Sequence, residues 1–342
     1  MDKKSGHSSN KNLYIGIREI AALANVSTAT VSRVINTPEL CSPATRKKVE
    51  QIIKEYNYVP NESITRIFSK SSKTIAFFIL DIENPFYTNL ILELNDLCFK
   101  KRYTLLICAT ENDEKKEQAY LEFCLAKRCE GIIVTEGVSR NNFKNISIPI
   151  VTLDRQISPQ TPCVTSEGYH SVRKSINYMY NLGHRKIGFI GPEDLCSIDI
   201  RFSGYTDELT EKGLDIKPEY IFRKKASPNP QLGKEALQYY LSISDAPTAV
   251  FCANDMIALG LINEATLMRI SIPENLSVCG YDHVLSNYLY MPLTTIEQNI
   301  PKIASALFKA LTQPSSNASL EIIDVNFIPG KTCSRLKDSK RI

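Results

Sequence analysis

The chain has 342 residues, of which 43% are hydrophobic and 23% are charged, and its formal net charge is +4. This length predicts two or three domains with a sizeable core, and the composition excludes a disordered or collagen-like chain. No apolar run approaches the roughly 20 residues that a membrane span needs, and residues 1–12 are polar where a secretory signal would be apolar, so we expect a cytoplasmic protein.

The positive charge is concentrated near the start of the chain. Residues 1–74 contain 12 Lys and Arg against 6 Asp and Glu, which gives +6, whereas residues 75–342 contain 29 against 31, which gives −2. A basic segment on a slightly acidic body is typical of a nucleic-acid-binding module joined to a larger domain. The alternative is a basic face that only meets solvent.

The first predicted elements are two helices separated by a tight turn. Residues 17–24 and 28–35 place apolar side chains at helical spacing, and Asn25-Val26-Ser27 interrupts them. Asn25 tolerates the left-handed backbone of a corner, and the Ser27 hydroxyl can cap the second helix.

A third helix is predicted from residue 44 to about residue 56. Ser42-Pro43 supplies a capping residue followed by proline at the first helical position. The apolar positions expected on its inner face are Val49, Ile52, Ile53 and Tyr56. Three short helices of this kind predict a helix-turn-helix domain over residues 1–60, here called the head.

The residues of the head resemble those of a known family. The run from Ile17 to Asn36, with Ser42 to Arg46 and Tyr56 to Asn61, is similar to the start of the LacI/GalR family of bacterial transcription regulators. The resemblance implies that the second helix enters the major groove of DNA. It places Thr28, Ala29, Ser32 and Arg33 on the DNA surface, and Asn36, Thr45, Arg46 and Lys47 on phosphates.

Arg33 is the residue best suited to reading a base. Its guanidinium can donate two hydrogen bonds to one guanine edge, which is worth about 1 to 3 kcal/mol of discrimination. Ala29 offers only a methyl contact. The alternatives are a surface ion pair for Arg33, and a solvating or capping role for Thr28 and Ser32.

Residues 61–73 are predicted to form a short hinge helix, capped by Asn61, and a flexible linker. In the family, paired hinge helices open the minor groove with a leucine that follows an Ala-Arg pair. Here Ile64-Thr65 aligns with that pair and Ile67 with the leucine, so the hinge departs from the pattern. Ile67 is expected to wedge between base steps, with Phe68 as a competitor and helix-helix packing as the alternative.

The body, residues 74–334, alternates apolar strand-like runs with amphipathic helical stretches. The predicted strands are residues 74–80, 103–109, 131–135, 150–153, 186–190, 249–252 and 277–280. Such alternation predicts parallel sheets in α/β layers, with ligands at the carboxyl ends of the strands.

Motifs in the body resemble the family's effector-binding domain, which is similar to a sugar-binding periplasmic protein. They include Asp81 to Tyr87, Gly183 to Ile187, Gly280 to Asp282 and Pro292 to Ile296. The resemblance implies a helix-turn-helix head plus a two-lobed periplasmic-binding-protein-like α/β body. The first lobe would comprise about residues 75–163 and a helix near 300–312. The second lobe would comprise about residues 164–292 and a final strand near 321–328. Residues 335–342 would form a tail.

Six side chains are expected to bind a ligand between the lobes: Asn84, Phe86, Asp154, Arg201, Asn254 and Asp282. Asp154, Asn254 and Asp282 follow predicted strands, and Arg201 would open a helix. Carboxylates accept from neighbouring hydroxyls and an arginine donates to ring oxygens, so the set suits a polyhydroxylated molecule such as a sugar, with Phe86 stacked on its apolar face.

These assignments have structural alternatives. Asp255 is expected to cap a helix, Asp154 could pair with Arg155 or Arg185, and Arg201 with Asp282 could form a salt bridge between lobes. Ser166-Glu167 stands where the family has Asp-Asn, so the sequence does not assign the ligand contacts at the rim of the pocket.

The sequence contains no motif that demands an enzyme or a cofactor. The four histidines are scattered, and His184, which follows a glycine, is expected to be structural. Ten cysteines occur without a C-x-x-C pair, so we expect reduced core residues and neither a disulfide nor a metal framework.

The sequence therefore predicts a transcription repressor that binds a pseudo-palindromic operator in double-stranded DNA as a homodimer, without membrane contact, under control of a carbohydrate effector. The effector could act as inducer or co-repressor. The tail has no heptad run, so a dimer is expected and not a coiled-coil tetramer. The alternatives are a solute-binding protein of transport and a sugar-processing enzyme, which the absent export signal and the absent catalytic constellation disfavour.

Overall fold

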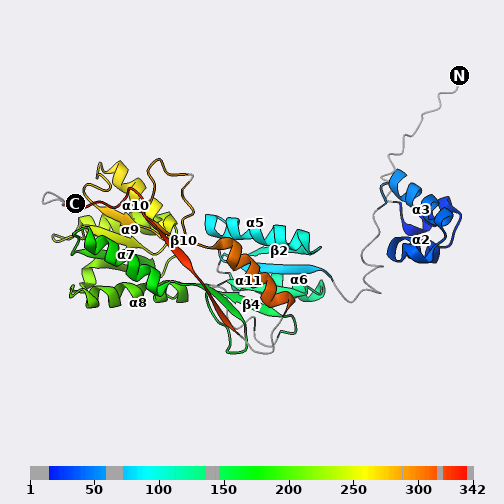
Figure 1. Ribbon diagram of the computed structural model, residues 1–342, viewed down its shortest axis with the longest axis horizontal. Coiled ribbons are helices and arrows are strands. Elements are labelled where there is room, and N and C mark those ends of the chain that lie inside the picture. Colours follow the sequence, from blue (N-terminus) through cyan, green and yellow to red (C-terminus); the bar gives the residue numbers. More distant parts are fainter. Residues whose placement is uncertain are drawn as a thin grey trace, which may run out of the picture. The chain divides into compact units, whose positions relative to one another are not determined.

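The computed structural model describes residues 15–58, 72–111, 113–135, 143, 146–286, 288–313 and 319–336. The chain divides into two compact units, Met1–Ser72 and Lys73–Ile342, and Figure 1 labels the helices and strands of each. The predicted hinge, including Ile67, lies outside the described residues except for Ser72 and Lys73.

The first unit is the predicted helix-turn-helix. It contains α1 (Ile17–Ala24), α2 (Thr28–Asn36), a 3₁₀ turn (Pro38–Leu40) and α3 (Pro43–Glu55). Asn25 has the predicted left-handed backbone, with φ 52°, and the hydroxyls of Ser27 and Ser42 accept from the amides of Thr30 and Thr45. The helix limits agree with the prediction to within one residue, and the corner and both caps are confirmed.

A small core holds these helices together. Its buried members include Ile20 and Ala24 of α1, Val31 of α2 and Val49 of α3. The inner-face prediction was wrong for Tyr56, which is 44% exposed. Tyr56 caps the end of α3, and the chain turns back so that Tyr58, 8% exposed, fills the core in its place.

The first lobe of the body is built on a six-stranded parallel sheet in the order β11-β5-β4-β3-β1-β2. The strands are β1 (Thr74–Ile79), β2 (Thr104–Ala109), β3 (Gly131–Thr135), β4 (Ile150–Leu153), β5 (Cys163–Ser166) and β11 (Leu320–Ile323). Helices α5 (Pro85–Lys100) and α11 (Ile300–Thr312) share one apolar core with one face of the sheet, and α6 (Glu114–Ala126) packs on the other face.

The second lobe has a four-stranded parallel sheet in the order β7-β6-β8-β9. Its strands are β6 (Ile187–Pro192), β7 (Ile221–Lys224), β8 (Ala249–Cys252) and β9 (Ser277–Cys279), with a 3₁₀ turn at Pro218–Tyr220. Its helices are α7 (Tyr169–Asn181), α8 (Cys196–Glu211), α9 (Pro230–Leu241) and α10 (Asp255–Leu267). Figure 1 shows α7 with α8 on one side and α9 with α10 on the other.

The segments that cross between the lobes differ from the sequence prediction. In place of one final strand over 321–328 in the second lobe, the structure has β11 in the sheet of the first lobe and β12 (Val325–Ile328), which pairs antiparallel with β10 (Thr295–Gln298). The unpredicted strand β5 offers its outer edge to β11. An apolar run alone does not reveal such an edge, because the pairing depends on residues far away in the chain.

Candidate functional site

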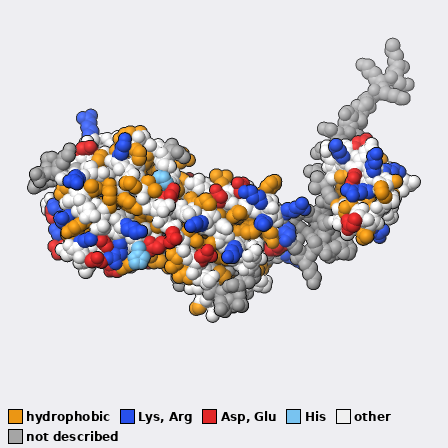
Figure 2. Space-filling view, viewed as in Figure 1, with side chains coloured by type: hydrophobic (Ala, Val, Ile, Leu, Met, Phe, Trp, Pro, Cys, Tyr) orange, Lys and Arg blue, Asp and Glu red, His pale blue; other side chains and the backbone are white. Residues whose placement is uncertain are grey.

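The exposed face of α2 carries the residues predicted to meet DNA. Thr28, Ala29, Arg33 and Asn36 are exposed and Ser32 is half-buried. Asn36 Nδ2 donates to the carbonyl oxygen of Ser32 at 2.9 Å, which ties the end of this face together. Lys and Arg side chains spread over the side of this unit seen in Figure 2.

Two of the three predicted phosphate contacts of α3, Thr45 and Arg46, are in local hydrogen bonds. Ser42 Oγ donates to Thr45 Oγ1 at 2.8 Å, and Arg46 Nε donates to Glu50 Oε1 at 2.7 Å. The Arg46–Glu50 pair is half exposed on both sides, so it contributes little and can be exchanged for a phosphate.

In the body, a cavity that is partly open to solvent lies between residues of the two lobes. It brings together all six predicted ligand residues: Asn84, Phe86, Asp154, Arg201, Asn254 and Asp282. The prediction missed further lining residues, which are Leu80, Asp81, Tyr87, Leu195, Ser197, Ile198, Ser227, Pro228 and Gln298. A mixed polar and apolar lining of this kind is typical of a small-molecule site.

Arg201 lies in the second turn of α8, whereas the sequence predicted it at the start of the helix. Its side chain is buried, with 5% of the residue exposed. Its Nη1 donates to the carbonyl oxygen of Ala253 at 2.6 Å, and its guanidinium carbon lies 3.6 Å from the centre of the Tyr281 ring. These contacts fix the guanidinium at the wall of the cavity.

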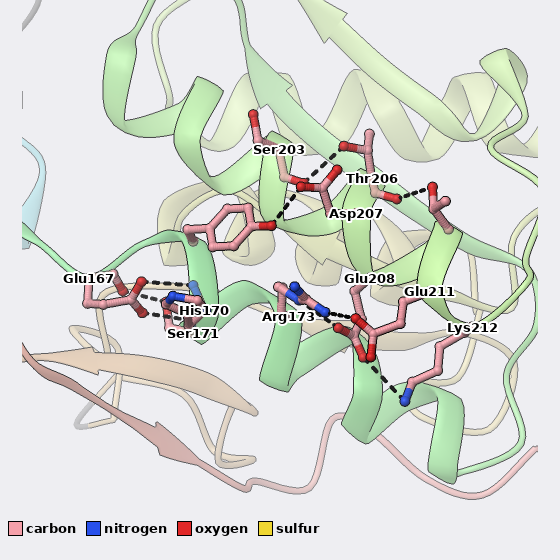
Figure 3. A network of polar contacts seen from close by, with 12 residues as sticks. Glu167, His170, Ser171, Arg173, Ser203, Thr206, Asp207, Glu208, Glu211 and Lys212 are labelled. Atoms are coloured by element: carbon pink, nitrogen blue, oxygen red, sulfur yellow. Dashed lines mark hydrogen bonds and ion pairs between the residues drawn. The ribbon is translucent and has the colours of Figure 1, made fainter.

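The helix that carries Arg201 is anchored to α7 by a polar network (Figure 3). Arg173 of α7 forms ion pairs with Glu208 and Glu211 of α8, and Tyr169 Oη donates to Asp207 Oδ2 at 2.6 Å. Glu167 accepts from two backbone amides and so caps α7. Arg201 is therefore presented from a helix that is joined to its neighbour by ion pairs and a hydrogen bond.

Asp154 and Asp282 are carboxylates of the cavity wall. Thr165 Oγ1 donates to Asp154 Oδ1 at 3.0 Å, and Gln298 Nε2 donates to Asp282 Oδ1 at 2.6 Å. Burial raises the pKa of Asp154, and it raises the pKa of Asp282 to about 7, while the charge of Arg201 opposes both shifts. The carboxyl group of Asp154 is thus bound by Thr165, and Arg185 donates instead to the carbonyl oxygens of Tyr180 and His184.

Asparagine side chains cap two of the helices that start at the cavity. Asn84 Oδ1 accepts from the Phe86 amide at the start of α5, and Asn254 Oδ1 accepts from the Ile257 amide at the start of α10. Asn254 also donates to the carbonyl oxygen of Pro228 at 3.0 Å. Phe86 is 4% exposed and packs edge-on against Tyr87.

Asp255 has a different role from the predicted helix cap, since Asn254 is the cap of α10. The fully buried carboxyl of Asp255 accepts from Thr295 Oγ1 at 2.6 Å and from the Val284 amide at 2.9 Å. Burial and the nearby Asp282 raise its pKa to about 8. Asp255 thus joins α10 to β10, one of the crossing segments.

Gln298 is the most informative residue that the sequence prediction missed. Its Nε2 donates to Asp282, and its Oε1 accepts from Ser166 Oγ at 2.5 Å. It thereby links β5 of the first lobe, β10 and the loop after β9 of the second lobe. Ser166, where the family has Asp, belongs to this chain of hydrogen bonds.

His184 has the buried surroundings that the sequence predicted, and eight of the ten cysteines are buried. His184 is fully buried, with Nδ1 2.9 Å from Thr248 Oγ1 and Nε2 donating to the carbonyl oxygen of Ser334 at 3.0 Å. All ten cysteines lie in described segments and none forms a disulfide. The described residues contain no cluster of His, Cys, Asp and Glu suited to a metal ion. No helix among them is long and apolar enough to span a membrane.

Comparisons with known proteins cover both units. Residues 16–61 match the model of bacterial regulatory proteins of the lacI family, and residues 176–333 match a periplasmic binding protein-like domain. The chain is 31% identical over 320 residues to the HTH-type transcriptional repressor PurR of Mannheimia succiniciproducens, which covers 91% of this chain and 95% of the relative.

Solved structures agree in fold. The lac repressor dimer bound to operator and the anti-inducer ONPF superposes with a TM-score of 0.80 at 23% identity, over 94% of this chain and 99% of the other. A periplasmic binding protein/LacI transcriptional regulator from Alkaliphilus metalliredigens complexed with D-xylulofuranose gives a TM-score of 0.66 at 26% identity, over 76% and 99%.

Proposed function

Because the chain belongs to the lacI family of bacterial regulatory proteins, we propose that it is a transcription repressor whose operator affinity is controlled by a small polyhydroxylated effector in the cavity of the body. The observation that carries the proposal is that one chain combines a capped helix-turn-helix with an exposed α2 face and a two-lobed body with a polar cavity.

The face of α2 is suited to sequence reading. Arg33 is exposed and can donate to both acceptors of a guanine, while Ala29 can contact a thymine methyl group. Thr28, Ser32 and Asn36 lie on the same side of the helix. Thr45 and Arg46 would hold phosphates, which adds affinity without sequence information, and Ile67 would enter the minor groove.

The cavity supports a carbohydrate-like effector. Asp154, Asp282 and Arg201 provide acceptors and a donor for several hydroxyl groups, and Phe86 provides an apolar wall. The structurally similar regulator from Alkaliphilus metalliredigens holds D-xylulofuranose. Repression that responds to such a molecule needs no catalytic step. A repressor of this kind acts in the cytoplasm, where the DNA is.

A homodimer is supported by apolar side chains left exposed on the body. Leu92 and Phe99 of α5 lie seven residues apart and are 66% and 82% exposed, and Tyr290 is 89% exposed. Two heads tethered in one dimer bind two half-sites far more tightly than a single head does. An effector changes operator affinity to the extent that it binds the two states of the dimer differently.

The proposal is tested by selecting randomised duplex DNA on the purified full chain, at a salt concentration that suppresses non-specific phosphate binding. We expect an enriched motif with two-fold symmetry. Arg33→Ala is expected to lose the enrichment at one position of each half-site. Failure of the unaltered chain to enrich any motif would contradict a role as an operator-binding repressor.

A further inference from the structure

Positive charge gathers at one edge of the sheet of the first lobe. Strands β2, β1 and β3 are adjacent and parallel, so the residues that precede them lie at the same edge. The backbone is hydrogen-bonded there, since the Thr104 amide donates to the carbonyl oxygen of Lys73 at 2.7 Å. Six basic residues precede these strands, and we call them the basic rim: Lys73, Lys100, Lys101, Arg102, Lys127 and Arg128.

The basic rim is exposed to solvent and little of its charge is neutralised. All six residues are exposed. Lys73 Nζ lies 3.7 Å from Glu130 Oε2 and 4.6 Å from the centre of the Tyr103 ring. Within the described segments, no carboxylate forms an ion pair with the other five rim residues. Lys and Arg side chains are visible in Figure 2 at the end of the first lobe, where α5 and α6 end in Figure 1.

This charge contrasts with that of the rest of the body. Residues 75–342 carry a net charge of −2, and within them the rim residues together with Glu130 contribute +4, which leaves −6 for the remainder. Charges of one sign that share one surface attract a polyanion more strongly than the same charges spread over the molecule.

Helix ends alone do not require so many basic residues. A cation near the end of a helix interacts favourably with the helix dipole, yet α7, α9 and α10 end without a basic residue in the last turn or at the cap. The turns do not require arginine either. Arg102 and Arg128 have left-handed backbones, with φ 60° and 54°, and glycine adopts this conformation at lower cost, as Gly183 does after α7.

The extent of the basic rim suits several phosphates. Helices α5 and α6 pack on opposite faces of the sheet, so the rim continues along the edge of the sheet and from one face to the other. Double-stranded DNA carries one phosphate charge per about 1.7 Å of its axis, so a surface of this kind contacts several phosphates at once. A small anion would use only one or two of the rim residues.

The basic rim also includes the residue at which the body begins. The chain divides after Ser72, so the head is covalently joined to the body at Lys73, a member of the rim. A covalent tether raises the effective concentration of a second contact. DNA held by the head has this advantage at the rim, and a free acidic protein does not.

We propose that the basic rim binds the phosphate backbone of the DNA that the head holds, so that the body itself adds DNA affinity without reading the sequence. The inference rests on the proposed function and adds a DNA-contacting surface outside the head and the hinge. Lys101 and Lys127, the cap residues that end α5 and α6, are expected to contact phosphates.

Charge variants of the full chain test the proposal. Lys101→Gln combined with Lys127→Gln removes two charges of the rim. Lys174→Gln combined with Lys225→Gln is the matched control, because it removes two exposed lysines of the second lobe and changes the net charge equally. Binding to a duplex of arbitrary sequence is measured by fluorescence anisotropy at several salt concentrations.

We expect the rim variant to bind at least about tenfold more weakly than the control at about 0.1 M salt. The slope of log affinity against log salt should be smaller in magnitude by about 1 to 2 per protomer, because each phosphate contact contributes about 0.9. A rim variant with the affinity and the salt slope of the control would overturn the proposal.

Photo-crosslinking tests direct contact. Benzoylphenylalanine, a photoreactive amino acid, is placed at position 101 or 127, and at position 174 as the control. We expect crosslinks to the labelled duplex from at least one rim position and none from position 174. Absence of a crosslink from both rim positions, as expected if the rim binds an acidic protein instead, would overturn the proposal.

Failure of the inference is distinguishable from failure of the proposed function, because a duplex of arbitrary sequence requires no operator. An enriched operator together with DNA binding that is insensitive to the rim variant would overturn only the inference. DNA binding that depends on the rim, without any enriched operator, would contradict only the proposed function.

Discussion

Single side chains at the junction of the lobes couple protonation to stability. Asp255 is fully buried between α10 and β10 with a pKa of about 8, against 3.8 for an unburied aspartate. Between pH 3.8 and about pH 8, Asp255 keeps its proton in the folded chain, whereas the same carboxyl has released its proton in the unfolded chain. Stability conferred by the protonated carboxyl is therefore complete at low pH and is lost as the pH rises toward 8.

We predict that the free energy of unfolding of the Asp255→Asn variant falls less steeply between pH 5 and pH 7 than that of the unaltered chain. One such group changes the slope by up to about 1.4 kcal/mol per pH unit. Urea unfolding at constant ionic strength measures this dependence of the free energy of unfolding on pH. Asp207→Asn is the control, and its slope is expected to equal that of the unaltered chain. Equal slopes in the unaltered chain and in Asp255→Asn would contradict the assignment.

The candidate site shows what residue patterns could and could not predict. Asp154 and Asp282 were predicted because they follow apolar strands, and Arg201 because its surroundings resemble the family. Gln298 was missed, because it ends a short strand whose partner β12 lies some distance along the chain and its contacts come from both lobes. Tertiary pairing of this kind leaves no local signal.

At the scale of elements, α9 and α10 approach closely over two glycines. A Cβ atom on Gly260 would lie 1.8 Å from the carbonyl oxygen of Pro230, and one on Gly233 would lie 1.9 Å from that of Ile257. Only residues without a side chain allow backbones to come this near. The starts of both helices border the cavity through Pro228 and Asn254, so this packing sets one of its walls.

Gly260→Ala is accordingly predicted to destabilise the body by about 3 kcal/mol, because the methyl group forces the two helices apart. Gly213→Ala provides the comparison: its Cβ would meet nothing within 4 Å, and its φ of +66° costs only backbone strain, about 1 kcal/mol. Chemical denaturation of both variants gives the two values. A smaller loss for Gly260→Ala than for Gly213→Ala would refute the packing argument.

The strands that the sequence predicted correctly are those with buried apolar runs, such as β1 and β8. The missed strands lack this signal. Strand β5 reads Cys-Val-Thr-Ser, and β11 is an edge strand with Leu320 and Ile322 more than half exposed. Apolar runs were recognised even at sheet edges, as in β2 and β9, whereas β5 was missed although it lies inside its sheet, because it is short and half polar.

For the whole molecule, the exposed apolar face of α5 predicts association through the body. Light scattering is expected to give a dimer at micromolar concentration, and Phe99→Glu is expected to weaken it by at least about tenfold, since a buried carboxylate without a partner is costly. Phe123→Glu is the control, because Phe123 of α6 is also exposed but lies beyond the opposite face of the sheet. A monomeric unaltered chain, or a tetramer, would contradict this assembly.

The most direct test of the account compares binding to a selected operator with binding to a shuffled duplex, by fluorescence anisotropy at several salt concentrations. We predict that Arg33→Ala lowers the ratio of the two affinities by about 10-fold or more, since one guanine contact is worth about 1 to 3 kcal/mol, and that salt-dependent binding persists. Arg46→Ala should weaken both affinities alike and leave the ratio unchanged. An unaltered ratio in Arg33→Ala would contradict the claim that α2 reads the operator.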